Sequence, residues 1–168
     1  MSTISPLGRY DDDATREDLH DVHLLNMPVR VLIASRERHD ELMREFALLA
    51  LGGPSGRPDI PDRLLELITI LGVRYGHAAA RPDELVDAAV ARGEATINLS
   101  YTVPGHVVEA ADNLDALMRE ADEFCRSEQL LTLARSDVMV RFAGWYLDEF
   151  RRQVAGEPPR PWDGPLDP

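Results

Sequence analysis

The chain alternates apolar and polar residues most regularly between positions 96 and 103, with the two-residue period of a half-buried strand. The apolar positions of this run are Ile97, Leu99, Tyr101 and Val103. Residues 29–34 form a nearly continuous apolar run rich in branched side chains, which is typical of a strand buried on both faces. Residues 130–134 form a third short apolar run. The pattern therefore predicts three strands.

Apolar residues recur three or four positions apart in the rest of the body, which is the spacing of one helix face. Ser35 and Ser136 occupy N-cap positions before two of these segments, and Pro61 and Pro82 occupy first-turn positions of two others. The predicted helices cover about residues 36–51, 61–75, 82–93, 106–126 and 137–154.

The predicted order is β-α-α-α-β-α-β-α, which indicates an α+β fold. We expect a small sheet of three or more strands with helices packed mainly on one of its faces. Composition separates this body from the two ends of the chain. Residues 1–21 are polar and acidic and are expected to form a flexible arm. Residues 156–168 are rich in proline and should form an extended tail, so residues 22–155 are a single predicted domain.

Net charge limits the classes of partner. Thirty acidic residues against 18 cationic residues, all of them arginine, give a formal charge of -12. Phosphate backbones and anionic membranes repel such a chain, so we expect neither nucleic acid nor a membrane as partner. The single Cys125 excludes an internal disulfide, and the sequence contains neither a signal-peptide pattern nor a stretch of 18 apolar residues. The expected location is the cytoplasm.

Recognisable catalytic motifs are missing from this sequence. The absence of lysine excludes Schiff-base chemistry and the lysine of a phosphate-binding P-loop. No serine lies in a G-x-S-x-G motif, and no G-x-G-x-x-G segment occurs. Cys125 falls at the end of a predicted helix among acidic residues, which disfavours a thiolate and favours a buried structural thiol. We therefore predict no cofactor and favour a protein that is not an enzyme.

Asp18, His20 and His23 are the candidate metal ligands. If this segment is helical, both imidazoles lie on one side of the helix and a nearby carboxylate completes a site. The alternative is that all three are solvated residues leading into the fold, and the sequence offers no second histidine pair that would support a metal site.

Arg36 and His39 are candidate ligand-binding residues at the start of the first predicted helix, with Arg38 beside them. Backbone N–H groups and the helix dipole make such a terminus attractive to anions. Tyr101 on the alternating strand is a further candidate for a cleft in this region. The alternative is that these arginines form exposed pairs with neighbouring glutamates along the helix.

Trp145, Tyr146 and Trp162 are candidate partner-binding residues. Trp145 and Tyr146 are adjacent on the last predicted helix, so their rings point in different directions and one of them can lie at an interface. Trp162 lies in the proline-rich tail, which is stiff enough to dock into a groove. The alternative for all three is packing within the core of their own domain.

Two strand-to-helix segments, VRVLIASRERHDELMREFALLAL and LLTLARSDVMVRFAGWYLDEFRRQ, and the strings FCRSEQLLTL and WYLDEF resemble a class of uncharacterised bacterial proteins. Those proteins accompany anti-sigma-factor kinases and their antagonists in partner-switching systems. The resemblance covers roughly residues 22–162 and implies a signalling partner or regulator. The asparagine-bearing helix motif and the glycine-rich D-x-G-x-G segment of the kinases are absent, so the resemblance implies no ATP chemistry and carries over no functional residue.

Two functions follow from these observations. The first is a non-enzymatic regulatory module that binds another protein or forms a homodimer, because catalytic motifs are missing while a half-polar strand, aromatic residues and a proline-rich tail are present. The alternative is a small-ligand sensor or an enzyme with a cleft near the start of the first predicted helix. A cavity in which imidazole, guanidinium and carboxylate groups meet would favour the alternative.

Overall fold

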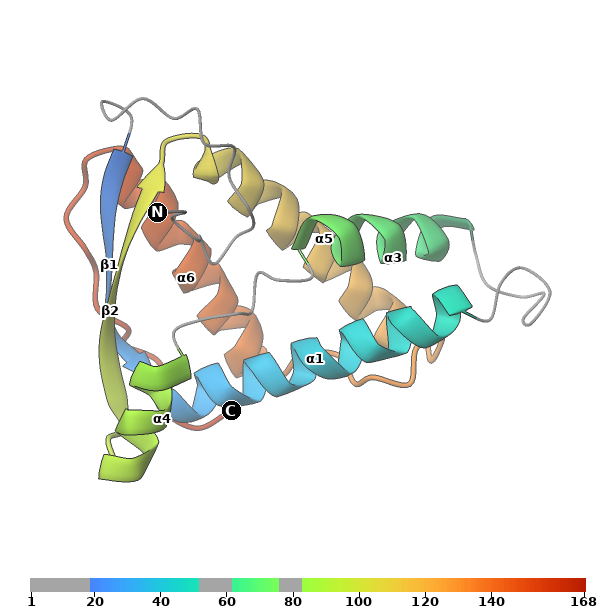
Figure 1. The fold of residues 1–168 in the computed structure, drawn as a ribbon, viewed down its shortest axis with the longest axis horizontal. Helices are drawn as coiled ribbons and strands as arrows, with labels where there is room; N and C mark the ends of the chain where they lie inside the picture. Colours follow the sequence, from blue (N-terminus) through green and yellow to red (C-terminus); the bar gives the residue numbers. More distant parts are fainter. Residues whose placement is uncertain (1–18, 52–61, 76–82) are drawn as a thin grey trace.

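The computed structural model describes residues 19–51, 62–75 and 83–168, which form an α+β domain (Figure 1). Its elements, in chain order, are β1 (Leu19–Pro28), α1 (Val29–Leu51), α3 (Asp62–Tyr75), α4 (Asp83–Arg92), β2 (Thr96–Pro104), α5 (Val107–Arg126) and α6 (Asp137–Val154). The predicted fold class is confirmed, whereas the sheet of the described part has two antiparallel strands instead of three or more. Of the predicted N-terminal arm, residues 19–21 are described, and they belong to β1.

The two strands cover the core with one face only. Leu24 of β1 lies opposite Leu99 of β2, and both leucines are buried on the inner face, as the alternation of β2 predicts. The outer face is polar, and the side chains of His23 and Ser100 form a hydrogen bond across it at 2.8 Å. On the inner side, α6 packs against β1 and lies behind the sheet in Figure 1.

β1 is absent from the sequence prediction because its alternation is short and interrupted. Val22 and Leu24 are buried on one face, and a bulge then disturbs the pairing between Leu24 and Met27. Asn26 lies in this bulge with a φ of 55°, a left-handed conformation that asparagine tolerates, and its N–H donates to Oδ1 of Asn98. The extra residue returns Met27 to the buried face, so the strand continues although its two-residue period is lost.

Residues 29–34 are helical, which corrects the prediction of a strand there. The helix α1 begins at Val29, so Ser35 lies inside it instead of capping it. Val31 and Leu32 are buried against the cluster that covers the sheet. A short continuous apolar run fits a buried helix as well as a buried strand, and in this protein the packing of α1 beneath the sheet decides between them.

Residues 130–134 form an irregular segment, which corrects the prediction of a third strand. In place of a neighbouring strand, Glu45 of α1 accepts hydrogen bonds from two consecutive backbone N–H groups of the segment. Arg38 donates from Nε to the carbonyl of Leu133 at 3.0 Å. These side chains form the hydrogen bonds that a neighbouring strand would otherwise supply to the backbone. The segment can therefore remain irregular without leaving these backbone groups unpaired.

The remaining predicted helices are confirmed, and their observed ends lie within a residue or so of the expected ones. Ser136 caps α6 as predicted, because its hydroxyl accepts a hydrogen bond from the N–H of Met139. Cys125 is buried near the end of α5, as expected of a structural thiol. Burial raises the pKa of this thiol.

Two apolar clusters make up the interior. The first joins the inner face of the sheet to α6 and to the beginnings of α1 and α5, and it includes the fully buried Leu24 and Phe150. The second lies between α1, α3 and the C-terminal half of α5, and it includes Leu42 and Leu67. Leu114 of α5 packs against both clusters, so the core changes from one to the other along α5.

Residues 156–168 form an extended strap over their own domain. The N–H of Trp162 donates to the carbonyl of Leu25 in β1 at 2.9 Å. Glu149, a fully buried carboxylate of α6, accepts the N–H of Arg160 at 2.9 Å. The tail is extended as predicted, and these bonds attach it to both the sheet and α6.

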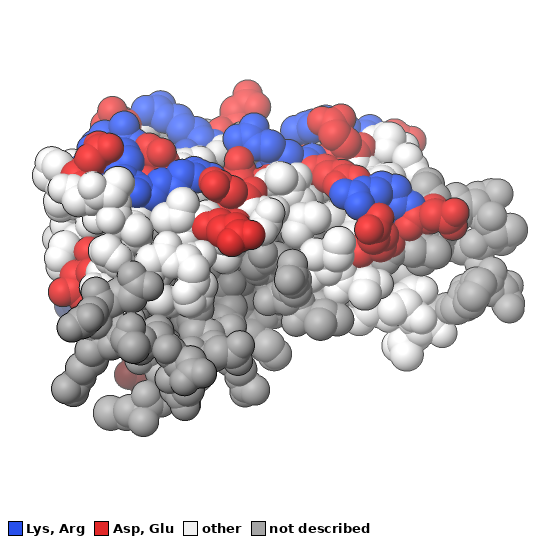
Figure 2. Space-filling model, turned by 90° about the horizontal axis from the view of Figure 1, so that it is seen from above, with Lys and Arg blue, Asp and Glu red and all other residues white. Residues whose placement is uncertain are grey.

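Charges of both signs are mixed on the surface. Arginines lie among aspartates and glutamates over the face shown in Figure 2. Exposed pairs such as Arg92 with Glu94 and Arg141 with Asp163 contribute to this mixing, although solvent screens them and each adds little stability. None of the described helices combines the length and the apolar character that crossing a bilayer requires.

The strap is expected to contribute substantially to stability. Replacing Trp162 by alanine removes a buried indole from the first cluster and should lower the free energy of unfolding by about 3–5 kcal/mol. Urea denaturation followed by circular dichroism measures this. The control Leu166→Ala removes a partly exposed side chain from the same strap and should change the free energy by less than about 0.5 kcal/mol. Equal effects of the two variants would show that the indole is not part of the core.

Candidate functional site

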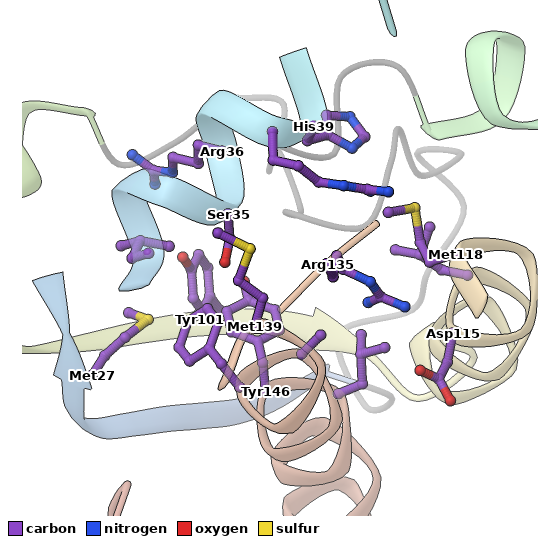
Figure 3. Close-up of a pocket in the computed structure, with 16 residues that line it drawn as sticks. Met27, Ser35, Arg36, His39, Tyr101, Asp115, Met118, Arg135, Met139 and Tyr146 are labelled. Carbon is purple, nitrogen blue, oxygen red and sulfur yellow. The ribbon is translucent and has the colours of Figure 1, made fainter. Parts of the chain in front are cut away.

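A cavity of about 170 Å³ lies between α1, α5, α6 and the inner face of the sheet (Figure 3). It lies where the two apolar clusters meet, since Leu114, which packs against both, lines it. Half of its lining side chains carry no polar group: Met27, Leu32, Leu114, Met118, Met139, Phe142, Ala143 and Leu147. Apolar cavities with a few polar groups are the usual form of small-molecule sites.

Asp122 of α5 holds two arginines beside this cavity. Its Oδ1 accepts a hydrogen bond from Nη2 of Arg38 on α1 at 2.9 Å, and its Oδ2 accepts one from Nε of Arg135 at 2.8 Å. The backbone N–H of Arg135, just before α6, also donates to Oδ1. None of the three side chains is more than 7 % exposed. One carboxylate therefore joins α5 to α1 and to the segment before α6, and it balances only one of two buried guanidinium charges.

Four buried side-chain atoms of the described residues have no hydrogen-bond partner, and all four belong to residues that line the cavity. These atoms are Ser35 Oγ, Arg38 Nη1, His39 Nε2 and Arg135 Nη2. Leaving a buried polar atom without a partner costs about 1–3 kcal/mol, and native structures leave few of them. Their occurrence around a single cavity indicates a place for a polar ligand.

Burial determines the protonation of these groups. Desolvation lowers the pKa of His39 below its ordinary value, so its imidazole is neutral at pH 7. Burial also lowers the pKa of Arg38, against the attraction of Asp122, but a guanidinium stays charged in proteins. Burial raises the pKa of Tyr101, whose hydroxyl therefore remains protonated. The buried groups of the site are therefore two cations, one anion and neutral donors, and Arg36 and Asp115, which also line the cavity, are only partly buried.

The structure brings Arg36, His39 and Tyr101 together at this cavity, as the sequence interpretation of a cleft expects, and Tyr146 joins them. Tyr101 and Tyr146 lie close together in Figure 3 and share a side-chain hydrogen bond. The expected helix terminus is wrong, because α1 begins at Val29 and Arg36 and His39 lie about two to three turns inside it. They reach the cavity from the side of the helix, so its dipole does not explain the site.

Trp145 and Trp162 lie inside the domain instead of on a surface that faces a partner. Both indoles are buried, and their ring centroids are 5.6 Å apart in an edge-on arrangement. Phe142 packs against both of them. The core packing that the sequence leaves open as an alternative is the arrangement found for these two tryptophans.

The geometry assumed for the metal hypothesis is wrong. His20 and His23 lie on β1, where residues three apart point to opposite faces, so the two imidazoles cannot share an ion. Asp18 lies outside the described residues. Within residues 19–51, 62–75 and 83–168, no group of three or more potential metal ligands occurs.

Sequence reasoning misses Arg135 and Asp122 as site residues and assigns Ser35 to a cap. Two of the site positions nevertheless carry a signal in the sequence. Ser35 and Arg38 fall on the apolar stripe of α1, at the spacing of one helix face. A polar residue on an apolar stripe indicates a buried polar site, but this stripe is recognisable only when the helix is known to start at Val29.

Comparison with known proteins gives no match: no protein-family model, no curated protein and no solved structure matches this chain. The resemblance to proteins of partner-switching systems therefore stays a prediction. The function has to be inferred from the chemistry of the cavity itself.

The buried imidazole of His39 predicts a loss of stability in acid. Below pH 6.5, the ordinary pKa of histidine, the unfolded chain binds a proton at His39 that the folded chain does not bind. The free energy of unfolding therefore decreases as the pH is lowered. His39→Gln removes this contribution and should reduce the slope by up to about 1.4 kcal/mol per pH unit below pH 6.5. Urea denaturation over a series of pH values measures the slope.

The control for this experiment is Leu48→Gln, which introduces the same amide at an exposed position of α1 without removing a titratable group and should keep the slope of the original protein. An unchanged slope in His39→Gln would mean that the imidazole takes up its proton freely in the folded state, contrary to its burial beside the cavity.

Proposed function

We propose that this protein is a non-enzymatic regulatory module that senses a small organic anion bound in the cavity between α1, α5 and α6. The observation that carries the proposal is the set of four unpartnered polar atoms around one largely apolar cavity. The anionic group of a ligand would accept hydrogen bonds from the unpartnered polar atoms, and its apolar part would pack against the apolar side chains of the cavity. This is the ligand-sensor alternative of the sequence interpretation, with a different physical basis.

The charge of the site supports an anion in particular. Arg38 and Arg135 each have one guanidinium nitrogen without a partner, while Asp122 compensates one of their two charges. A buried charge without a counter-ion is costly, and hydrogen bonds between ionised groups are the strong ones. An anion at these nitrogens would therefore be bound and would also stabilise the fold.

Binding accounts for the site better than catalysis does. The Ser35 hydroxyl and Nε2 of His39 both lack a partner, so they do not form the hydrogen-bonded pair of nucleophile and base that acyl transfer uses. Burial raises the pKa of the Cys125 thiol, which disfavours the reactive thiolate. These groups offer hydrogen bonds to a ligand without an activated nucleophile among them.

Thermal unfolding with a panel of small carboxylates, sulfonates and phosphate esters tests the proposal. A ligand at 100 times its dissociation constant adds about 2.7 kcal/mol, which corresponds to a rise in Tm of roughly 5–10 °C for a chain of this size. We expect at least one anion to give such a rise, and we expect Arg135→Gln to abolish it. Arg38 keeps Asp122 paired in that variant, so the fold should remain intact.

The matched control is Arg30→Gln, which removes the same charge from an exposed position paired with Asp167 and should keep the ligand-induced rise. The proposal fails if no anion of the panel raises Tm, or if Arg135→Gln keeps the full rise.

A protein partner is the second candidate function, and two exposed leucines favour it. Leu131 and Leu133 are 84 % and 80 % exposed on the irregular segment between α5 and α6. The same segment is held by Arg38, which donates to the carbonyl of Leu133 and lines the cavity. Exposed apolar side chains near one another are typical of an interaction surface. The partner-switching role implied by the sequence resemblance belongs to this candidate.

Light scattering tests the second candidate with a second copy of the chain as the partner. We expect a mass above that of one chain, 18.8 kDa, at high protein concentration, and we expect Leu131→Ser with Leu133→Ser to restore the single-chain mass. Leu85→Ser, which changes an exposed leucine on α4, is the control and should leave the mass unchanged. A single-chain mass at every concentration would exclude self-association through this segment.

A further inference from the structure

The lining of the cavity combines buried guanidinium groups with apolar side chains. In Figure 3, Arg135 points toward the side where Met118 and Asp115 lie, whereas Met27 and Tyr101 lie at the opposite side. The unpartnered guanidinium nitrogens belong to Arg135 and Arg38, and Asp122 holds both arginines. A ligand that fits this lining is amphipathic, with a charged group on an apolar body.

The balance of buried charge selects a single negative charge. Among the buried groups, Arg38 and Arg135 with Asp122 leave one positive charge, and His39 adds none because it is neutral. Arg36 also lines the cavity, but it is only partly buried, so solvent screens its charge. Asp115 is paired with Arg119 at 3.0 Å and so contributes no net charge. A monoanion therefore neutralises the site, whereas a phosphate monoester, with a charge of about −1.5 to −2 near pH 7, would leave buried negative charge.

The groups without a partner are all donors, which suits an acceptor-only group such as a carboxylate. Arg38 Nη1, Arg135 Nη2, the Ser35 hydroxyl and an Nε2–H tautomer of His39 are four donor atoms, and they offer six N–H or O–H groups because each guanidinium nitrogen carries two hydrogens. A carboxylate has two oxygens with about four acceptor positions. An uncharged amide has one carbonyl oxygen and two N–H donors, so it leaves part of these donors unpaired and part of its own hydrogen bonds unmade.

The volume of the cavity limits the apolar part of the ligand. A dry apolar cavity of about 150 Å³ binds benzene in another protein, and this cavity has about 170 Å³. An apolar body of about one aromatic ring therefore fits among Leu32, Met139 and Phe142, which belong to the lining. A nucleotide or a second ring exceeds this volume.

We propose that the ligand is a small monocarboxylic acid whose apolar body is about the size of one aromatic ring, bound as its carboxylate between Arg38 and Arg135. This inference rests on the proposed function, since it names the class of anion that the sensor takes. It also assigns the two halves of the ligand to separate parts of the cavity, which makes each half testable by itself.

Isothermal titration calorimetry with four probes tests the assignment on the full chain. Phenylacetate carries both halves of the ligand and should bind with the lowest Kd. Removing the charge with 2-phenylacetamide, or doubling it with phenyl phosphate, should raise Kd roughly tenfold or more. Removing the ring with acetate should raise Kd by roughly a hundredfold, because the apolar burial is lost.

Two variants locate the probe in the cavity. Ala143→Leu places additional carbon atoms in the space assigned to the ring and should raise the Kd of phenylacetate at least roughly tenfold. Gly144→Ala is its control on the same helix, because an added Cβ there meets nothing within 4 Å, and it should keep the original Kd. Arg135→Gln should abolish phenylacetate binding, and it provides the same test if Ala143→Leu does not fold.

The outcomes separate this inference from the function on which it rests. If phenyl phosphate or 2-phenylacetamide binds as tightly as phenylacetate, the carboxylate assignment is overturned while a sensor of another ligand remains. If phenylacetate does not bind but another anion raises Tm through Arg135, the ligand class is wrong and the proposed function stands. If no anion binds at all, both are wrong.

Discussion

The shared carboxylate of Asp122 is the interaction on which the arrangement of the helices around the cavity depends. Two arginines that are distant in sequence, Arg38 and Arg135, are both buried because this one side chain accepts hydrogen bonds from each of them. Removing a charge from water costs several kcal/mol, so neither guanidinium would be buried at this place without the carboxylate. The same arrangement leaves one positive charge uncompensated, and this charge gives the cavity its preference for an anion.

The position of the cavity follows from the way in which the core is divided. One cluster packs α6 under the sheet, the other packs α1 and α5 against α3, and Leu114 lies between them. Side chains of both clusters, such as Phe142 and Met118, line the space at their junction, and the buried polar groups occur beside it. The segment of residues 130–134 is shaped by the same region, because Arg38 and Glu45 bind its backbone where a strand would otherwise do so.

The parts of the fold that the sequence predicts are those in which local pattern and tertiary packing agree. The helices α5 and α6 have long uninterrupted stripes, and β2 alternates over its full length, so their existence and inward faces are evident from the residues. The start of α1 was not predictable in this way, because an apolar run of six residues fits a buried strand and a buried helix equally well. β1 was not predicted either, because the bulge at Asn26 interrupts its alternation of buried and exposed residues.

The residues alone determined the fold class, the inward faces of these elements and four members of the site, Arg36, His39, Tyr101 and Tyr146, although the helix terminus expected for Arg36 and His39 and the partner interface expected for Tyr146 were not the reason. The spacing of residues along the chain shows only which side chains share a face of one helix or strand, because the periods of helices and strands span only a few residues. The convergence of Ser35 and Arg38 with Arg135, which lies about a hundred residues further on, was decided by tertiary structure. That convergence required α1 and α5 to pack together and Asp122 to compensate the charge, and neither condition is written in a local pattern.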